Sequence, residues 1–186
     1  MNIIVFFSGS GTNLKSIIDK QAHYGYKVIG ALTNNPDAGG VKICNSQKVD
    51  LRIIDHKNYS ERDLFDQEID RYLHTLNPDY IILAGFMRIL GKRLVDSWEG
   101  QIINIHPSLL PKYKGIYTHQ RALDNNEKFS GCTVHYVNSK LDSGKIILQK
   151  KVKILKTDNI DKLAKRILKQ EHLLYPKALK KILTNR

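Results

Sequence analysis

Residues 2–13 read Asn-Ile-Ile-Val-Phe-Phe-Ser-Gly-Ser-Gly-Thr-Asn, an apolar run followed at once by small and polar residues. Residues 3–7 have the length and composition of a buried strand, and apolar residues at helical spacing follow over 13–20. A strand, a turn rich in glycine and serine, and a helix in this order are typical of a unit in which a helix covers a parallel sheet. The start of the chain therefore predicts an α/β fold.

The same alternation of strand and helix signals continues through the first two-thirds of the chain. We expect further strands at Lys27–Thr33, Leu51–Ile54, Tyr80–Leu83 and Gln101–Asn104, and helices at Gly39–Lys48 and from a cap at Ser60 to about His74. The second of these helices should turn one apolar face inward, formed by Leu64, Phe65, Ile69 and Leu73. Short apolar strands separated by helices predict a mostly parallel sheet that is flanked by helices.

The pattern changes after Pro111. The ranges 131–138 and 145–153 look like two strands joined by a turn, so an antiparallel strand pair is expected to extend the sheet. The chain closes with a helix from about Asp158, which Pro176 is expected to kink or break. No linker, internal repeat or low-complexity tract interrupts the sequence, which predicts a single domain.

Composition places the chain among ordinary folded proteins. At 186 residues it fits one domain, residues 1–186, with 41% hydrophobic and 26% charged residues. The N-terminal apolar run is too short for a signal peptide and no apolar stretch is long enough to cross a bilayer, so we expect no membrane attachment and a cytoplasmic location. Cys44 and Cys132 lack the spacing of a metal or redox motif, which favours reduced thiols.

The formal net charge of +12 is the one unusual compositional feature. Clustered lysine and arginine are typical of proteins that bind nucleic-acid phosphates, so a nucleic-acid-binding module without catalysis is one interpretation. The lysines are instead spread along the chain, with their densest groups at 145–156 and 177–181 and with few aromatic residues between them. This distribution favours a solvated surface that attracts small anionic substrates, and we expect no nucleic-acid partner.

The loop Ser8–Asn13 joins the first strand to its helix. Small residues allow a ligand to approach the backbone closely, and free N–H groups at the start of a helix favour an anion. The lysine of a phosphate-binding P-loop is missing, and Leu14 stands where a dinucleotide-binding loop has its third glycine. The loop indicates a phosphate site, although a tight turn with Thr12 or Asn13 capping the helix is also consistent with it.

A second group of polar residues follows the fifth expected strand, in the sequence Asn104-Ile105-His106-Pro107. Residues two apart point to the same side of a strand, so Asn104 and His106 are expected to project into one cleft. An amide beside an imidazole suits acyl transfer, because Asn104 can polarise a carbonyl while His106 stabilises the oxyanion or delivers a proton. A structural histidine that fixes the loop before Pro107 is the alternative.

Asp142 bears on the choice between these two interpretations. It lies in Leu-Asp-Ser-Gly, residues 141–144, where an aspartate is also an ordinary turn residue. If this turn folds over the fifth strand, Asp142 can pair with His106, orient its ring and favour the protonated form. No histidine spacing indicates a metal. Among the other histidines, two could lie near the site and three are expected at the surface, namely His119 and His135, and then His23, His56 and His74.

The twelve residues Asn-Ile-His-Pro-Ser-Leu-Leu-Pro-Lys-Tyr-Lys-Gly, at 104–115, resemble the signature of the formyltransferase family that uses 10-formyltetrahydrofolate. The resemblance covers nearly the whole chain. Further stretches stand in the order that the family has: Ser8–Asn13, Ala84–Leu90, Thr118-His119, Leu141–Gly144, and Gln170–His172 with Tyr175-Pro176. Several motifs in the right order are far more specific than any one of them, and they imply a single-domain, Rossmann-like formyltransferase fold.

Within this family the chain most resembles the members that formylate the amine of phosphoribosylglycinamide in purine synthesis. The resemblance implies this ribonucleotide as substrate, 10-formyltetrahydrofolate as cosubstrate, and no metal. It places the family's catalytic residues at Asn104, His106 and Asp142, and its substrate contacts at Gly11, Thr12, Asn13 and Glu171. It places the folate pocket at Arg62, Met87, Arg88, Ile89, Leu90 and Asn104, with residues 138–142 closing over it.

Two positions depart from the family pattern, and two related activities stay open. Tyr117 stands where many relatives have a histidine, and Leu168 occupies a position that is often polar, which affects fine substrate contacts. The alternative activities are those of methionyl-tRNA formyltransferase, which carries an additional C-terminal domain, and formyltetrahydrofolate deformylase, which usually carries an N-terminal one. Since the first strand starts at Asn2 and the closing helix reaches almost to Arg186, we expect neither addition. We expect a monomer or a weak homodimer.

Overall fold

The structure of the chain, a computed structural model, describes residues 1–184. Asn185 and Arg186, which close the predicted single domain, lie outside the described residues. Within the described range the strands form one seven-stranded sheet in the order β3-β2-β1-β4-β5-β6-β7. The strands are β1 Asn2–Phe7, β2 Lys27–Thr33, β3 Leu51–Ile53, β4 Tyr80–Leu83, β5 Ile102–His106, β6 Phe129–Tyr136 and β7 Ile146–Lys153.

The pairing of the strands confirms the predicted fold class. Neighbouring strands from β3 to β5 are parallel, whereas β6 pairs antiparallel with β5 and β7 pairs antiparallel with β6. Two strands match their predicted bounds, Lys27–Thr33 and Tyr80–Leu83. The fifth strand reaches two residues beyond the predicted Asn104 and ends at His106, so both polar residues of the candidate site belong to one strand.

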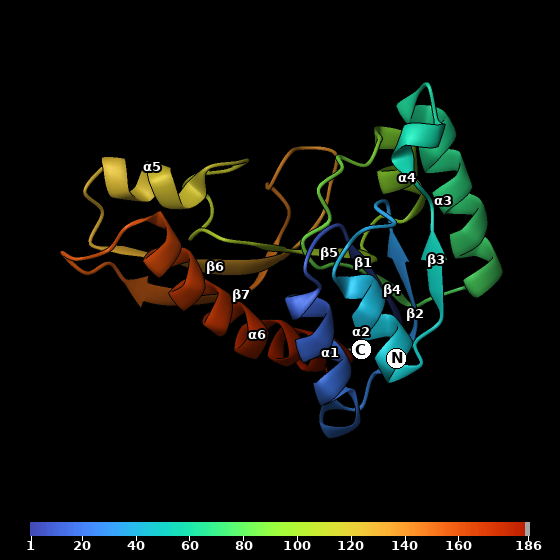
Figure 1. The fold of residues 1–186 in the computed structure, drawn as a ribbon, viewed down its shortest axis with the longest axis horizontal. Helices are drawn as coiled ribbons and strands as arrows, with labels where there is room; N and C mark the ends of the chain where they lie inside the picture. The colour runs from blue at the N-terminus through green and yellow to red at the C-terminus, as the bar shows by residue number, and fades with distance from the viewer. Residues whose placement is uncertain (185–186) are drawn as a thin grey trace.

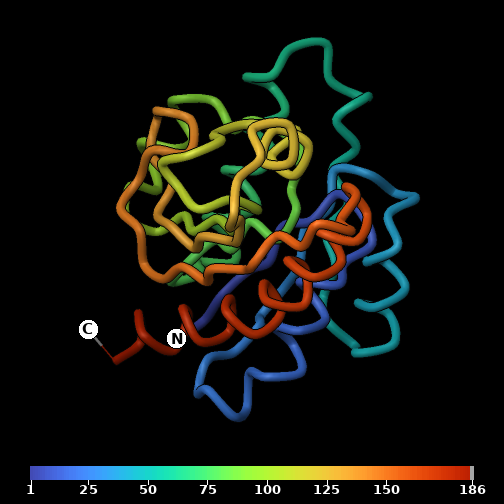
Figure 2. The backbone as a smooth tube through the Cα atoms, turned by 90° about the vertical axis from the view of Figure 1, so that its left-hand side faces the viewer, coloured from blue at the N-terminus to red at the C-terminus, as the bar shows by residue number. Residues whose placement is uncertain are grey.

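Helices cover both faces of the sheet. They are α1 Thr12–Tyr24, α2 Gly40–Gln47, α3 Arg62–Leu76, α4 Lys92–Ser97, α5 Thr118–Asp124 and α6 Ile160–Thr184, with a short 3-10 turn, η1, at His56–Asn58. Figure 1 shows α3 and α4 on the side of the sheet opposite α1 and α6. In Figure 2 the long α6 runs alongside α1. A parallel sheet requires such cover on both faces, because its strands are apolar on both sides.

The core consists of two hydrophobic clusters, one on each face of the sheet. The first lies between the sheet and helices α1 and α6, and its helical members include Leu14, Ile17, Leu163, Ile167 and Leu179. The second lies under α3 and α4, and its helical members are Phe65, Ile69, Leu73, Leu94 and Val95. Because both faces are buried, the carboxyl ends of the parallel strands are held rigidly at one edge, where loops are free to bind ligands.

The beginning of α3 differs from the prediction. Ser60 is not the cap: Glu61 takes that position and makes no side-chain capping hydrogen bond. Leu64, predicted on the apolar face, is 47% exposed, whereas Asp66 is buried. One residue corresponds to about 100° of helical rotation, which turns Leu64 toward solvent. The buried stripe of α3 contains Phe65, Asp66, Ile69 and Leu73.

The closing helix and two short helices also differ from the prediction. Pro176 does not break α6, which continues to Thr184. A proline inside a helix removes one hydrogen bond and costs about 3 kcal/mol, but Pro176 belongs to the buried face of α6 with Tyr175 and Leu179, so packing outweighs that cost. Helices α4 and α5 were not predicted, because segments of 6 and 7 residues are too short to show a helical period.

Composition predicted reduced thiols and no membrane-spanning segment. Cys44 and Cys132 are free and buried. Among residues 1–184, none of the helices combines the length and the apolar composition that a bilayer-spanning segment needs.

Tyr175 joins two strands that end at the functional edge. Its side chain on α6 is fully buried, and its hydroxyl lies 3.0 Å from the carbonyl oxygens of Leu83 and of Ile103. Leu83 ends β4 and Ile103 lies within β5. Burial raises the pKa of Tyr175, which keeps the donor proton in place. One O–H shared by two buried carbonyls therefore ties α6 to both strands.

We predict that Tyr175→Phe lowers the free energy of unfolding by about 1–3 kcal/mol, because two buried carbonyls lose their donor while the ring volume is kept. Denaturant unfolding of the variant and the wild type measures the difference. Tyr117→Phe is the matched control, because Tyr117 is 73% exposed and its replacement should change stability by less than about 0.5 kcal/mol. Equal stability of the two variants would contradict the assigned role of the hydroxyl.

Candidate active site

Three loops follow the carboxyl ends of neighbouring parallel strands and meet at one edge of the sheet. The loop Ser8–Gly11, here called the anion loop, follows β1. Residues 84–91, here called the groove loop, follow β4, and residues 107–117 follow β5. The N–H of Ser8 donates to the carbonyl of Gly85 at 3.1 Å, so the anion loop and the groove loop are in direct contact. This is the edge at which open α/β sheets bind ligands.

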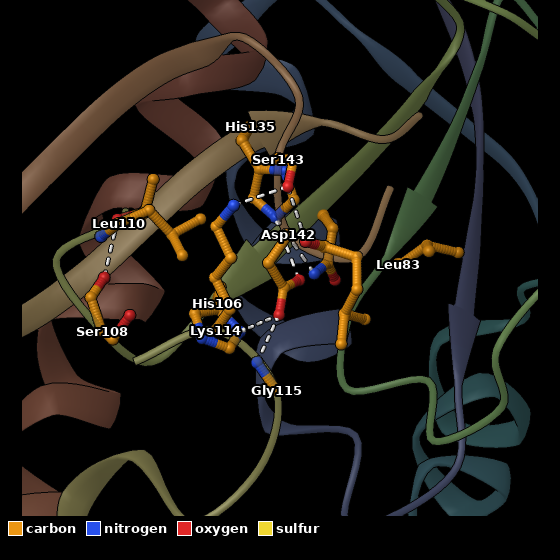
Figure 3. Close-up of polar contacts among 12 residues, drawn as sticks. Leu83, His106, Ser108, Leu110, Lys114, Gly115, His135, Asp142 and Ser143 are labelled. Carbon is orange, nitrogen blue, oxygen red and sulfur yellow. Dashed lines mark hydrogen bonds and ion pairs between the residues drawn. The ribbon is translucent and has the colours of Figure 1, made fainter. Parts of the chain in front are cut away.

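His106 and Asp142 lie side by side at this edge. The distance from His106 Nδ1 to Asp142 Oδ2 is 3.4 Å, and the two side chains are 7% and 8% exposed. The N–H of Gly115 donates to Asp142 Oδ2 at 2.8 Å, which fixes the carboxylate beside the ring, as Figure 3 shows. The structure thus brings together two residues that are 36 positions apart in the sequence, as predicted for a turn that folds over β5.

The second nitrogen of the His106 ring also faces an oxygen. His106 Nε2 lies 2.8 Å from the carbonyl oxygen of Tyr113. A carbonyl oxygen only accepts hydrogen bonds, and so does an ionised carboxylate. Only a doubly protonated ring can donate to both acceptors at once, and in that form His106 and Asp142 make an ion pair.

Asn104 lies next to His135, which the sequence had suggested could lie near the site without giving it a role. In the antiparallel pairing of β5 and β6, Asn104 is opposite His135, and Asn104 Nδ2 lies 3.3 Å from His135 Nε2. His135 Nε2 is also 3.7 Å from Asp142 Oδ1, and His135 Nδ1 is 2.8 Å from the carbonyl oxygen of Tyr136. The register of β6 against β5 carried this information, and it cannot be read from sequence spacing.

His135 is the neutral partner in this cluster. Burial lowers the pKa of His135 and the nearby His106 lowers it further, although the Tyr136 carbonyl and Asp142 oppose the shift. In a neutral ring whose Nδ1–H donates to Tyr136, Nε2 is free to accept from the Asn104 amide. His135 therefore orients Asn104, with its Nδ2 held toward the ring.

A groove of about 490 Å³ opens from this cluster between the groove loop and residues 137–142. All six residues predicted for the folate pocket line it: Arg62, Met87, Arg88, Ile89, Leu90 and Asn104. Apolar walls come from Phe86, Val95 and Val137 as well. The charged lining residues are Arg62, Arg88, Lys92 and Lys140, with Asp142 as the single acid among the described lining residues. The groove suits a flat, largely apolar molecule that carries negative charge at one end.

The anion loop leads into α1 without a side-chain cap. Gly11 takes the cap position with φ 75°, so the interpretation in which Thr12 or Asn13 caps the helix is wrong. A Cβ at Gly11 would lie 2.5 Å from Gly40 Cα, which leaves room for no larger residue. The first N–H groups of an uncapped helix need acceptors, and an anion supplies them.

Glu171 lies beneath this loop. The amide Nδ2 of Asn13 donates to Glu171 Oε2 at 2.8 Å, and both side chains are buried. Burial raises the pKa of Glu171, and the hydrogen bond from Asn13 opposes part of that shift. A carboxylate that is buried with one donor keeps acceptor positions open for a ligand with hydroxyl groups.

Several buried polar atoms near this side have no partner among residues 1–184: Asn13 Oδ1, His119 Nδ1 and His172 Nε2. Leaving such atoms unpaired costs free energy, so their presence indicates a polar ligand. Burial lowers the pKa of His119, and the charge of His106 lowers it further, which places His119 close to the His106–Asp142 pair. The sequence had suggested a position near the site for His119.

The remaining sequence predictions have mixed outcomes. His23 and His74 are exposed as predicted, but His56 is half-buried and its Nδ1 lies 2.9 Å from the carbonyl oxygen of Asn34. Tyr117 is exposed and caps α5, while Leu168 is half-buried on α6. Over the described part of the chain, no group of three or more acids, histidines and cysteines is arranged to hold a metal ion.

Comparison with known proteins gives a consistent result. The family model described as formyl transferase matches residues 1–179. The chain is 39% identical over 178 residues to phosphoribosylglycinamide formyltransferase of Escherichia coli strain K12, covering 95% of this chain and 84% of that protein. It is 41% identical over 181 residues to the trifunctional purine biosynthetic protein adenosine-3 of Drosophila melanogaster, covering 95% of this chain but only 13% of that protein.

Solved structures agree with the sequence comparison. The crystal structure of phosphoribosylglycinamide formyltransferase from Brucella melitensis matches with a TM-score of 0.92 and 38% identity, over 97% of this chain and 94% of that one. The structure of that enzyme from Bacillus halodurans matches with a TM-score of 0.94 and 36% identity, over 98% of this chain and 95% of that one. The chain belongs to the formyl transferase family.

Proposed function

We propose that the protein transfers the formyl group of 10-formyltetrahydrofolate to the amine of 5′-phosphoribosylglycinamide, yielding formylglycinamide ribonucleotide and tetrahydrofolate in de novo purine synthesis. The observation that carries the proposal is the buried His106–Asp142 ion pair beside Asn104, at the junction of an apolar groove and an anion loop. Acyl transfer needs such fixed donors where charge develops. We assign the reaction to the cytoplasm, with small-molecule substrates and a monomer or weak homodimer.

The groove supports the assignment of the folate. A pteridine ring is flat and needs apolar walls, which the groove loop and Val137 supply. The carboxylates of the folate tail need cations, and Arg62, Arg88 and Lys92 lie along the same groove. Asn104 at the inner end of the groove then faces the formyl group.

The anion loop supports the assignment of the ribonucleotide. Its phosphate accepts hydrogen bonds from the first N–H groups of α1, at Gly11, Thr12 and Asn13. Glu171 accepts hydrogen bonds from the ribose hydroxyls, and the amine at the other end of the substrate reaches toward His106.

In the proposed mechanism the amine nitrogen forms a bond to the formyl carbon, and the bond from that carbon to N10 of the folate breaks. Asn104 donates from Nδ2 to the formyl oxygen as negative charge develops there. His106 donates a second hydrogen bond from Nε2 to the formyl oxygen. To do so, Nε2 leaves the carbonyl oxygen of Tyr113, which it faces in the structure. Asp142 keeps the ring charged and helps to pass the proton that the amine loses to N10.

We predict turnover when the protein is mixed with 10-formyltetrahydrofolate and phosphoribosylglycinamide, measured as formation of tetrahydrofolate and of the formylated ribonucleotide. Methionyl-tRNA and water are the competing acceptors, and we expect neither to support comparable turnover. Transfer to methionyl-tRNA alone, or release of formate alone, would reassign the activity. A salt-sensitive gel shift with RNA in the absence of any turnover would favour a nucleic-acid-binding module.

We predict that His106→Ala and Asp142→Asn each lower kcat by about 10²–10³, because each removes the charged donor from the oxyanion position. Both variants should keep the wild-type fold, as circular dichroism and thermal unfolding can verify. His74→Ala is the matched control, since His74 is exposed on α3 away from the groove, and it should keep full activity. Full activity in either of the first two variants would remove that residue from the mechanism.

We predict that Glu171→Gln stabilises the fold at neutral pH while it weakens the ribonucleotide site. Burial raises the pKa of Glu171 above its unfolded value, so the folded state prefers the protonated acid. The stability that this preference contributes is complete below the pKa of the unfolded state, and it is lost as pH rises through the pKa of the folded state.

Glutamine stays neutral at every pH. From pH 4 to neutral pH, the free energy of unfolding of Glu171→Gln should therefore fall less than that of the wild type, as denaturant unfolding can measure. Its KM for the ribonucleotide should rise about 10-fold, because a neutral acceptor binds hydroxyl groups less strongly than a carboxylate. An unchanged KM together with unchanged stability would contradict both the burial argument and the ribose assignment.

A further inference from the structure

The groove loop, residues 84–91, has no regular secondary structure, yet it supplies one wall of the groove. Between residues 86 and 91, only two backbone N–H groups have an acceptor among the described residues. The N–H of Met87 donates to Ser8 Oγ at 2.7 Å, and the N–H of Gly91 donates to Asp66 Oδ2 at 2.6 Å. Both acceptors are side chains from other parts of the chain, and neither residue lines the groove.

Ser8 is itself held in one orientation. Since the N–H of Met87 can only donate, Ser8 Oγ accepts there and must direct its own proton elsewhere. It donates to Asn34 Oδ1 at 2.5 Å, and Asn34 is only 3% exposed. Asn34 Nδ2 in turn lies 3.1 Å from His56 Nδ1. A chain of hydrogen bonds of fixed direction therefore runs from the groove loop through Ser8 to Asn34, whose Nδ2 and carbonyl oxygen both lie near His56 Nδ1.

Asp66 fixes the other end of the loop. It is 6% exposed on α3, and no lysine or arginine nitrogen of residues 1–184 lies within 4.0 Å of its carboxylate. A Cβ at Gly91 would lie 2.6 Å from Asp66 Oδ2, so a side chain at this position would displace the carboxylate. Gly91 is also the cap residue of α4, which carries Lys92 and Val95 to the groove. Asp66 therefore anchors both the groove loop and the start of α4.

We propose that Ser8 and Asp66 are positioning residues for the folate site, which hold the groove loop in its binding shape through the backbone N–H groups of Met87 and Gly91. This inference rests on the proposed function, because it assigns the groove to 10-formyltetrahydrofolate. The loop is also held by the backbone hydrogen bond from Ser8 to Gly85, by the Phe86 ring, which packs edge-on against Phe6 with centroids 5.3 Å apart, and by the buried Leu90. Those contacts fix the loop's position, and the two hydrogen bonds fix where its exposed side chains point.

The test compares Ser8→Ala and Asp66→Ala, which each remove one acceptor, with Asp66→Asn, which keeps an acceptor oxygen without the charge. Ser97→Ala and Asp63→Ala are the matched controls, because Ser97 is an exposed serine at the end of α4 and Asp63 is an exposed aspartate on α3. We expect Ser8→Ala and Asp66→Ala to raise KM for 10-formyltetrahydrofolate by about 10-fold, the effect of about one hydrogen bond. Their kcat and their KM for the ribonucleotide should change by less than about threefold.

Asp66→Asn should restore KM to within about threefold of the wild type, since the role needs an acceptor and not an ion pair. Amide hydrogen exchange of residues 84–92 supplies a readout that is independent of turnover, and we expect faster exchange in both alanine variants but not in the controls. Direct titration with 10-formyltetrahydrofolate separates binding from chemistry.

Three outcomes would overturn the proposal. In the first, the KM for 10-formyltetrahydrofolate of Ser8→Ala and of Asp66→Ala stays within twofold of the KM of the control variants, whether or not amide exchange changes. The second is an equal loss of kcat and of both substrate affinities, which indicates a general structural defect. The third is wild-type protein that exchanges slowly at 84–92 but binds no 10-formyltetrahydrofolate. A wild-type protein that binds this folate without transferring its formyl group would overturn the proposed reaction alone and leave the positioning role supported by the titration.

Discussion

The antiparallel pairing of β6 with β5 is the constraint on which the active-site arrangement depends. It sets Asn104 opposite His135, and it returns the chain over the carboxyl end of β5, so that the turn with Asp142 reaches His106. The two added strands therefore do more than extend the sheet: they supply the acid of the ion pair and the far wall of the groove.

The electrostatics of the groove are local and are not a by-product of the overall charge. Residues 1–100 carry 12 basic and 12 acidic side chains, whereas residues 101–186 carry 18 and 6, so the net charge of +12 comes from the second half. Three of the four cations that line the groove, Arg62, Arg88 and Lys92, belong to the neutral half. The lysine-rich half adds a long-range field that attracts anions and is weakened by salt. The groove cations act at short range and determine how an anionic ligand is oriented in the groove.

Sequence reasoning succeeded where a feature depends on a short stretch and was incomplete where it depends on contacts between distant stretches. Strands such as Tyr80–Leu83 were predicted with their bounds, because an apolar run between polar residues is a local signal. All six residues of the expected folate pocket line one groove: residues 87–90 follow β4, Asn104 lies in β5 and Arg62 begins α3. Those predictions came from a resemblance in motif order and from the geometry of parallel sheets.

The parts that the sequence did not reveal depend on backbone atoms and on strand register. The acceptor at His106 Nε2 is the carbonyl of Tyr113, and the donor that fixes Asp142 is the N–H of Gly115; neither involves a side chain whose type could be recognised. The sequence had suggested a position near the site for His135, but only the register of β6 against β5 sets it opposite Asn104. Leu64 was misplaced because one residue shifts a helical position by about 100°.

The three histidines of the site differ in their surroundings. His106 has an acceptor at each ring nitrogen, whereas burial lowers the pKa of His135 and of His119, and the proximity of His106 lowers each of them further. Asp142 lies 3.4 Å from His106 Nδ1 and 3.7 Å from His135 Nε2, and burial is the larger effect that favours the neutral form of His135. The neutral His135 can then accept from Asn104 and hold its amide toward the groove. One network thereby joins the His106 imidazole and the Asn104 amide, and Asp142 lies against both His106 and His135 within it.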